Sequence, residues 1–212
     1  AHPQYIAGYS MVNRDQPKPA VFLDRDGTIC EEVGYLDHPD KLKLIPGSAE
    51  AIRNLREAGF WVFVTTNQSG VARGYFAESV VHLVHSRLDT LLAEAGARVD
   101  AYFYCPHHPK AVLEEYRREC RCRKPNIGMI EQAVAQFPVE LDRSFTVGDK
   151  LSDCEFGRNA GLTPVLVRTG YGREEEARLS AGQAGCRPAL VADDLAQAVA
   201  WILSHPLAMP KT

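Results

Sequence analysis

The chain has 212 residues, 45% of them hydrophobic, which suits a single domain with a substantial core. Its 24 lysines and arginines against 27 aspartates and glutamates give a formal net charge of -3, which excludes a global basic field for nucleic acid or an anionic membrane. No apolar stretch approaches the ~20 residues that span a bilayer, and residues 1–19 contain no continuous apolar signal-peptide core. We therefore expect a cytoplasmic monomer with no nucleic-acid partner and no contact with a membrane.

Strand-like and helix-like stretches alternate along the chain. Apolar runs of strand length occupy residues 21–23, 60–64, 101–104, 144–147, 165–167 and 189–191. Helical spacing predicts helices over residues 48–58, 81–95, 130–137, 154–160 and 193–203, and a surface helix with loops within 171–187. We expect Ser48 to cap the first helix and Asp193 the last. Repeated strand-helix units indicate an α/β fold: a doubly wound, mainly parallel, Rossmann-like sheet with helices on both faces.

The same pattern predicts the domain organisation. We expect residues 20–205 to form one domain, residues 1–19 to be an N-terminal extension and residues 206–212 a tail. No large cap domain fits between Ile29 and Ser48, or between the second and third strands. In such sheets the chemistry lies at the carboxyl ends of the strands. The polar or reactive residues that follow predicted strands are Asp24, Thr66, Cys105 and Asp149.

Two aspartates stand two residues apart in the segment Asp-Arg-Asp-Gly-Thr, directly after the first apolar run. Side chains two apart on an extended segment point the same way, so Asp24 and Asp26 can face one reacting group while Gly27 lets the chain turn away. One acid can attack phosphorus while the other handles the proton. A calcium loop is excluded, because its glycine position holds Ile29 and its closing glutamate position holds Tyr35. An acidic turn formed by chance stays open at this point.

Three further segments offer partners for these acids. Residues 65–70 follow the second strand with hydroxyl and amide groups suited to phosphate oxygens, although alone they are more typical of a polar turn. Residues 123–124 are an adjacent arginine and lysine, which can bind phosphate or simply be solvated. Asp149 follows the fourth strand and can share a Mg²⁺ ion with Asp24. Asp153 can support that site or cap the next helix.

The loop of residues 105–124 carries a second candidate metal site. Cys105, His107, Cys120 and Cys122 supply three thiols and one imidazole, close enough in sequence to close a tetrahedral zinc site. Incidental buried cysteines and a disulfide are the alternatives, and the lack of a secretion signal argues against the disulfide. Four protein ligands leave no open position, so we expect a structural zinc that places residues 123–124 at the rim of the active site.

The order of these motifs resembles the haloacid dehalogenase superfamily of phosphatases. The resemblance implies that Asp24 is the nucleophile, which forms an aspartyl-phosphate, and that Asp26 is the general acid and then the base. It also implies that Thr66 and Lys124 stabilise the transferring phosphoryl group. The Mg²⁺ ligands would be Asp24, Asp149 and the backbone carbonyl of Asp26.

Within this superfamily, the zinc loop together with Thr-Asn-Gln-Ser-Gly resembles the heptose-1,7-bisphosphate phosphatase family. The resemblance implies a phosphosugar partner and Mg²⁺-dependent removal of the C7 phosphate of D-glycero-D-manno-heptose 1,7-bisphosphate, in lipopolysaccharide precursor synthesis. The family would place these residues around the substrate: Glu32, Val33, Gly34, Tyr35, Thr66, Asn67, Gln68, Ser69, Arg123 and Lys124. Histidinol-phosphate phosphatases resemble the chain less, since they carry Asp where Ser69 stands and a shorter spacer before Cys120. A non-catalytic, zinc-stabilised binding module is the alternative outside enzymes, and the intact acids argue against it.

Overall fold

The computed structural model describes residues 16–183 and 185–209, and six strands of this part form one sheet. The strands are β1 (Ala20–Leu23), β2 (Trp61–Asn67), β3 (Ala101–Cys105), β4 (Phe145–Gly148), β5 (Thr163–Val167) and β6 (Leu190–Ala192). They lie in the order β3-β2-β1-β4-β5-β6, and every pairing is parallel. The predicted parallel sheet is confirmed. Its chain order reverses between β1 and β4, where open sheets of this kind place their ligand crevice.

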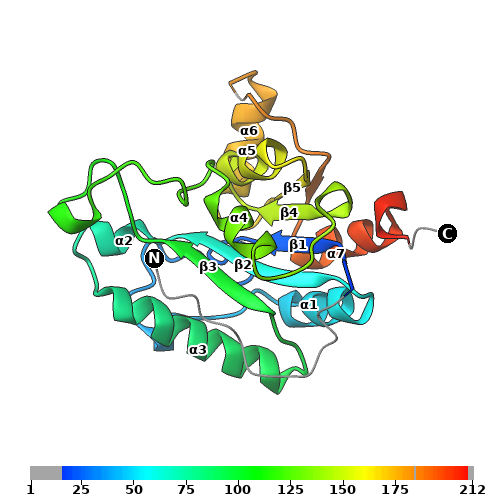
Figure 1. Ribbon diagram of the computed structural model, residues 1–212, viewed down its shortest axis with the longest axis horizontal. Coiled ribbons are helices and arrows are strands. Elements are labelled where there is room, and N and C mark those ends of the chain that lie inside the picture. The colour runs from blue at the N-terminus through cyan, green and yellow to red at the C-terminus, as the bar shows by residue number, and fades with distance from the viewer. Residues whose placement is uncertain (1–15, 184, 210–212) are drawn as a thin grey trace.

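Helices cover both faces of the sheet, as predicted. The α-helices in the described part are α1 (Ser48–Glu57), α2 (Ser69–Ala72), α3 (Glu78–Glu94), α4 (Gly128–Val134), α5 (Leu151–Asn159), α6 (Gly172–Ser180) and α7 (Leu195–Ser204). Helices α1, α3 and α7 pack on one face, and α4 and α5 pack on the other (Figure 1). Among the described residues, no helix combines the length and apolarity that a membrane crossing needs.

Alternating side chains of the strands build two hydrophobic cores. Val21 and Leu23 of β1 join the core beneath α1, α3 and α7, whereas Phe22 joins the core beneath α4 and α5. In that second core the ring of Phe63 lies 5.2 Å from Phe22 and 5.8 Å from Phe103, measured between ring centroids. Because both faces are buried, the strands read as continuous apolar runs, which is typical of parallel sheets.

Both predicted helix caps are wrong by one residue. Helix α1 begins at Ser48, but its N-cap is Gly47, whose φ of 84° favours glycine. Helix α7 is capped by Asp194, whose side chain accepts a hydrogen bond from the backbone N–H of Gln197. Asp193 instead forms an ion pair with the arginine that follows β5.

Strand β2 continues beyond its predicted end, and this extension positions part of the site. Its last three residues, Thr65, Thr66 and Asn67, pair with β3. The next residues form the short helix α2, which the sequence did not predict. The polar segment therefore begins as a rigid strand and ends as a helical turn.

The connections and chain ends complete the described fold. Between β1 and α1 lie a loop and one 3-10 helix (Pro39–Lys41), with no large cap domain. The loop between β3 and α4 contains a 3-10 helix (Glu114–Tyr116) and the predicted zinc ligands. Residues 1–15 of the predicted extension and residues 210–212 of the predicted tail lie outside the described residues. Lys18 already pairs with Val139.

Candidate active site

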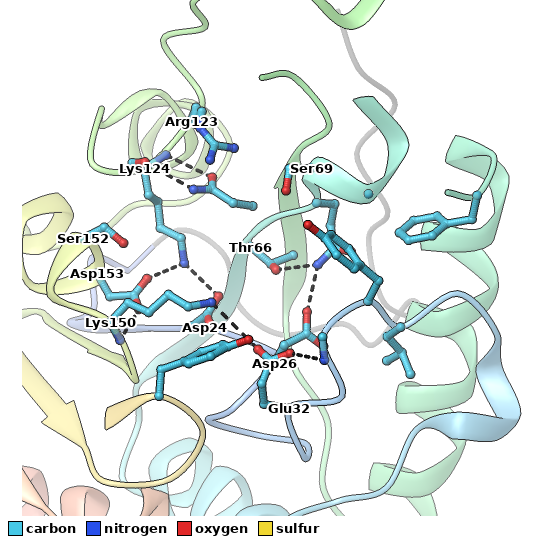
Figure 2. Close-up of a pocket in the computed structure, with 18 residues that line it drawn as sticks. Asp24, Asp26, Glu32, Thr66, Ser69, Arg123, Lys124, Lys150, Ser152 and Asp153 are labelled. Carbon is cyan, nitrogen blue, oxygen red and sulfur yellow. Dashed lines mark hydrogen bonds and ion pairs between the residues drawn. The ribbon is translucent and has the colours of Figure 1, made fainter. Parts of the chain in front are cut away.

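A cavity of about 410 Å³ opens at the carboxyl ends of β1, β2 and β4 (Figure 2). The predicted site residues on its wall are Asp24, Asp26, Glu32, Gly34, Tyr35, Thr66, Asn67, Gln68, Ser69, Arg123 and Lys124. Gly70, from the predicted polar segment, and Asp153 also line it, and the lining residues that were not assigned to the site from sequence are Leu36, Phe76, Lys150, Ser152 and Tyr171. The volume of the cavity falls in the range of small-molecule sites. The topology therefore brings five separate stretches of the chain into one cavity: residues 24–36, 66–76, 123–124, 150–153 and 171.

Asp24 follows β1 directly and is 6% exposed. Its backbone N–H donates to the carbonyl of Val147 at 2.9 Å, which continues the pairing of β1 with β4 into the site. The Nζ atom of Lys124 donates to Asp24 Oδ1 and to the carbonyl of Thr65, both at 2.8 Å. The same ammonium lies 2.6 Å from Asp153 Oδ1. Burial raises the pKa of Asp24 to about 6, because desolvation outweighs the opposing charge of Lys124.

Three buried carboxylates form an acidic cluster beside Lys124. Ligand oxygens of Asp24, Asp149 and Asp153 all lie within 4.8 Å of one another. Asp149 Oδ2 accepts a hydrogen bond from the backbone N–H of Tyr171 at 2.9 Å, while its buried Oδ1 has no partner among the described residues. Burial and the charges of Asp24 and Asp153 raise the pKa of Asp149 to about 8. Carboxylate oxygens of this kind are the ligands that Mg²⁺ prefers, so the cluster fits a divalent cation.

Asp26 lies apart from this cluster, with different partners. The Arg25 side chain donates from Nε to Asp26 Oδ1 at 3.1 Å and from Nη2 to Oδ2 at 2.8 Å. Gln68 Nε2 donates to Asp26 Oδ2 at 3.0 Å and to Thr66 Oγ1 at 2.8 Å. Burial would raise the pKa of Asp26, but the Arg25 charge overrides it and holds that pKa below its usual value. Asp26 is therefore a carboxylate at neutral pH in this arrangement.

Asn67 joins the end of β2 to the residues that follow the zinc loop. Its Oδ1 accepts from the Lys124 backbone N–H at 3.0 Å, and its Nδ2 donates to the Lys124 carbonyl at 3.2 Å. These two bonds fix the backbone from which the Lys124 ammonium reaches Asp24. The arrangement explains how a residue 100 positions away in sequence is delivered to the nucleophile.

The loop after the aspartates forms the opposite rim. Glu32 accepts a hydrogen bond from the backbone N–H of Gly34 at 2.6 Å, and Gly34 has a φ of 80°. The ring of Tyr35 meets that of Tyr75 edge-on, with centroids 4.6 Å apart. Val33 is 45% exposed and does not line the cavity. The loop therefore presents Glu32 and residues 34–36 to the cavity, while Val33 points away from it.

Lys150 is a wall residue that the sequence analysis missed. Its Nζ lies 3.8 Å from Glu32 Oε2 and 4.7 Å from the ring centroid of Tyr171. The signal was present in the sequence, since Lys150 directly follows Asp149 at the end of a predicted strand. Together with Arg123 and Lys124 it gives the cavity three cationic side chains.

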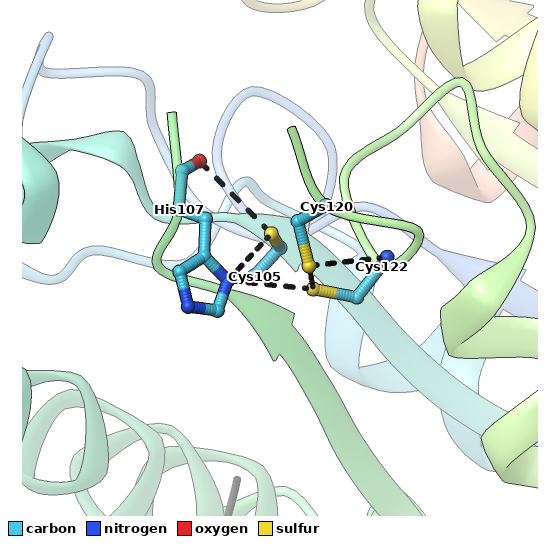
Figure 3. Close-up of side chains that lie close together, drawn as sticks. All are labelled: Cys105, His107, Cys120 and Cys122. Carbon is cyan, nitrogen blue, oxygen red and sulfur yellow. Dashed lines mark hydrogen bonds between the residues drawn. The ribbon is translucent and has the colours of Figure 1, made fainter. Parts of the chain in front are cut away.

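The predicted zinc ligands come together at the end of β3, which supplies Cys105, and on the loop that follows it (Figure 3). Their ligand atoms lie within 4.8 Å of one another. His107 Nδ1 lies 3.8 Å from the Sγ atom of Cys105 and 3.9 Å from that of Cys122, near the about 3.5 Å expected for sulfur and nitrogen on one tetrahedral zinc. The Sγ atoms of Cys120 and Cys122 are 2.7 Å apart, too far for a disulfide bond. The donor types and the distances from imidazole to sulfur fit a closed zinc site, in which these two sulfurs would move apart to about 3.8 Å.

The zinc loop is tied to the active site through Arg123. Its Nη1 donates to the carbonyl of His107 at 3.3 Å, while its side chain lines the cavity. Cys122 immediately precedes Arg123, and Lys124 follows it. A metal bound by His107 and Cys122 would thus hold the backbone on which both cations stand.

Comparison with known proteins agrees with this geometry. A HAD-hydrolase-like family model matches residues 121–198. The D-glycero-D-manno-heptose-1,7-bisphosphate 7-phosphatase of Thermosynechococcus vestitus is 44% identical over 193 residues, which cover 89% of this chain and 97% of the relative. The D-glycero-beta-D-manno-heptose-1,7-bisphosphate 7-phosphatase of Escherichia coli K12 is 44% identical over 153 residues, 72% of this chain and 80% of the relative.

A solved structure is similar over nearly the same extent. The crystal structure of D,D-heptose 1.7-bisphosphate phosphatase from B. bronchiseptica, complexed with magnesium and phosphate, is 35% identical in sequence, with a TM-score of 0.78. The alignment covers 88% of this chain and 99% of that chain. The chain therefore belongs to the haloacid dehalogenase-like phosphatases, in the family of the D-glycero-D-manno-heptose-1,7-bisphosphate 7-phosphatases.

Proposed function

We propose that this phosphatase hydrolyses the C7 phosphate of D-glycero-D-manno-heptose 1,7-bisphosphate. The observation that carries the proposal is the contact of Lys124 with Asp24, in a buried acidic cluster on the inner wall of a sugar-sized cavity. The names of relatives that match most of the chain supply the substrate. The product would keep its anomeric phosphate for later nucleotide activation in lipopolysaccharide precursor synthesis.

Asp24 would act as the nucleophile. Its carboxylate attacks phosphorus, the bond from phosphorus to the C7 oxygen breaks, and an aspartyl-phosphate forms. Asp26, a carboxylate before the substrate binds, would take up a proton as the negatively charged phosphate arrives beside it. It would give that proton to the departing sugar oxygen, and then take one from the water that hydrolyses the aspartyl-phosphate. Thr66 and Lys124 would donate hydrogen bonds to the transferring oxygens, where charge is concentrated in the transition state.

Two different metals fit the two ligand sets. Asp24, Asp149 and the backbone carbonyl of Asp26 would hold Mg²⁺, with Asp153 close by. When bound, Mg²⁺ supplies positive charge that offsets the repulsion between a carboxylate and a phosphate. The cysteine and histidine set would hold zinc in a structural role, because its four ligands leave no open position.

The second phosphate of the substrate would be bound by cations at the rim. Arg123 offers a planar fork suited to phosphate oxygens, and Lys150 offers a point charge. Glu32, Gly34, Tyr35, Asn67, Gln68 and Ser69 would surround the sugar. Val33 would contribute through its backbone, since its side chain is exposed outside the cavity.

We place this reaction in the cytoplasm. The six cysteines of the chain are all free thiols in the described structure, and free thiols are typical of a reducing compartment. Three of them, Cys105, Cys120 and Cys122, would serve poorly as zinc ligands if oxidised, since the thiolate is the form that binds metal.

Phosphate release tests the proposal directly. Heptose 1,7-bisphosphate and histidinol phosphate are compared with Mg²⁺ present, and Asp24→Asn serves as the blank. Strong preference for the bisphosphate, abolished in Asp24→Asn, is the expected result. Preference for histidinol phosphate would keep the mechanism and overturn the substrate. Turnover of neither would favour a different phosphoester substrate or a non-catalytic, zinc-stabilised binding module.

A further inference from the structure

Arg25 is a fully buried cation next to the proposed site, and the proposed chemistry gives it no role. It stands between Asp24 and Asp26 in sequence, is 0% exposed and does not line the cavity. Its Nε and Nη2 atoms both donate to Asp26, whereas Nη1 has no hydrogen-bond partner among the described residues. Both hydrogen bonds of the guanidinium thus go to one carboxylate, which the guanidinium contacts from the protein interior.

Asp26 has two further neighbours besides Arg25. Oδ2 accepts from the Gln68 amide at 3.0 Å, and Oδ1 lies 3.6 Å from the Cys30 thiol, whose single proton can go instead to the Arg25 carbonyl at 3.4 Å. A substrate oxygen that approaches from the cavity therefore meets Asp26 on the side where Gln68 now stands. Gln68 is the only one of these partners that lines the cavity, and it holds Thr66 with the same nitrogen.

We propose that Arg25 is a positioning residue for proton transfer. Its planar fork holds the Asp26 carboxylate from the interior, while the sugar oxygen, and then water, replaces the Gln68 amide at Oδ2. Oδ2 takes up a proton from solvent when the anionic substrate binds and passes it to the departing sugar oxygen, and a proton of the attacking water then returns to Oδ2. The inference rests on the proposed function, in which Asp26 is the acid and base. A lysine cannot reproduce the two parallel hydrogen bonds of an arginine.

The test compares two substrates that differ in their need for a proton. Heptose 1,7-bisphosphate leaves a basic sugar oxygen, whereas p-nitrophenyl phosphate leaves a stable phenolate. In single-turnover experiments with Mg²⁺, Arg25→Met should slow phosphoryl transfer from the bisphosphate about a hundredfold, within the range of general acid catalysis. KM should change little, and release of nitrophenolate in the first turnover should slow far less. The double variant Arg25→Met/Asp26→Asn should be no slower than Asp26→Asn alone, because Arg25 acts through Asp26.

Two further variants separate positioning from stability. Arg56→Met removes another largely buried arginine, which pairs with Asp100 at the opposite end of the sheet, and it should lower stability without altering the ratio of rates on the two substrates. Arg25→Lys keeps the charge in case the methionine variant does not fold, and it should recover only part of the rate on the bisphosphate.

The outcomes distinguish the inference from the function beneath it. If Asp26→Asn keeps the wild-type rate on the bisphosphate, the proposed role of Asp26 fails. If Asp26→Asn is slow but the folded Arg25 variants match the wild type, or slow both substrates equally, the positioning role of Arg25 is overturned. Full recovery in Arg25→Lys would also overturn it, since charge alone would then suffice.

Discussion

Lys124 is the residue on which the electrostatics of the nucleophile depend. It is 5% exposed and contacts Asp24 and Asp153 at once. Burial alone would lower the pKa of Lys124, but the two carboxylates raise it above its ordinary value, so the ammonium stays charged. A buried charge with two partners is costly to remove, because those partners are then left without a counter-charge.

Replacing Lys124 by methionine keeps most of the side-chain volume and removes the charge. We expect Lys124→Met to lose activity by about 10²- to 10³-fold, the usual effect of deleting a group that stabilises a developing oxyanion. Steady-state kcat on heptose 1,7-bisphosphate checks this. The matched control is Lys41→Met, which removes an exposed lysine paired with Asp37 and should leave kcat unchanged. A Lys124→Met enzyme within threefold of the wild type would contradict the assignment.

The acidic cluster predicts how stability depends on pH when metal is absent. The folded-state pKa values are about 8 for Asp149 and about 6 for Asp24, against 3.8 for an ordinary aspartate. The folded protein therefore holds more protons than the unfolded chain, and stability falls as pH rises from about 4 through 8. With EDTA, Asp149→Asn should lose less stability over this interval than the wild type. Urea unfolding at several pH values measures this, and parallel curves would contradict the prediction.

At the scale of elements, the carboxyl ends of parallel strands gather the site. β1 ends before Asp24, β2 carries Thr66, and β4 ends before Asp149. These positions could be predicted because each strand is an apolar run that stops at a polar residue. The exact end of β2 could not, since Thr65 to Asn67 are polar residues kept in the strand only by pairing with β3, which is a tertiary effect.

The sequence did not indicate the role of Arg25. That role depends on the burial of its side chain, and a basic residue between two acids is more typical of a solvated turn.

The sequence also could not fix where two of the helices begin. The N-cap of α1 was predicted one residue too late, because Gly47 and Ser48 are both acceptable caps. The N-cap of α7 was predicted one residue too early, because two aspartates stand side by side there. The residue types limit the N-cap to two adjacent positions, and the packing of the helix decides which of the two is used.

The zinc loop is the element with a metal-dependent prediction. Cys122→Ser removes one of the ligands that lie within 4.8 Å of one another, and should release the metal and lower thermal stability. Activity should fall as well, because Arg123 and Lys124 follow Cys122 directly. Metal analysis, melting curves and kcat test this together. Cys154→Ala is the control, since it alters a buried cysteine outside the cluster. Loss of activity with metal and stability intact would contradict a structural role.

At the scale of the whole molecule, charge must be concentrated locally for an anionic substrate to bind. The net charge of the chain is -3. The cations at the cavity are Arg123, Lys124 and Lys150. The acids on its wall or in the cluster behind it are Asp24, Asp26, Glu32, Asp149 and Asp153. Arg25, buried against Asp26, adds a fourth cation. When all five acids are ionised, as metal binding requires, they still outnumber the cations by one, so a phosphate dianion meets excess negative charge unless a divalent cation is bound.

Magnesium and phosphate should therefore bind cooperatively. Titration calorimetry with inorganic phosphate is expected to show weak or no binding in EDTA and measurable binding in excess Mg²⁺. Because linkage is reciprocal, phosphate should tighten Mg²⁺ binding by the same factor, typically about 5- to 150-fold. Asp149→Asn should reduce this coupling by removing one proposed Mg²⁺ ligand. If phosphate affinity does not depend on Mg²⁺, the cationic side chains alone are enough to bind phosphate. The acidic cluster then does not need a metal ion to offset its charge.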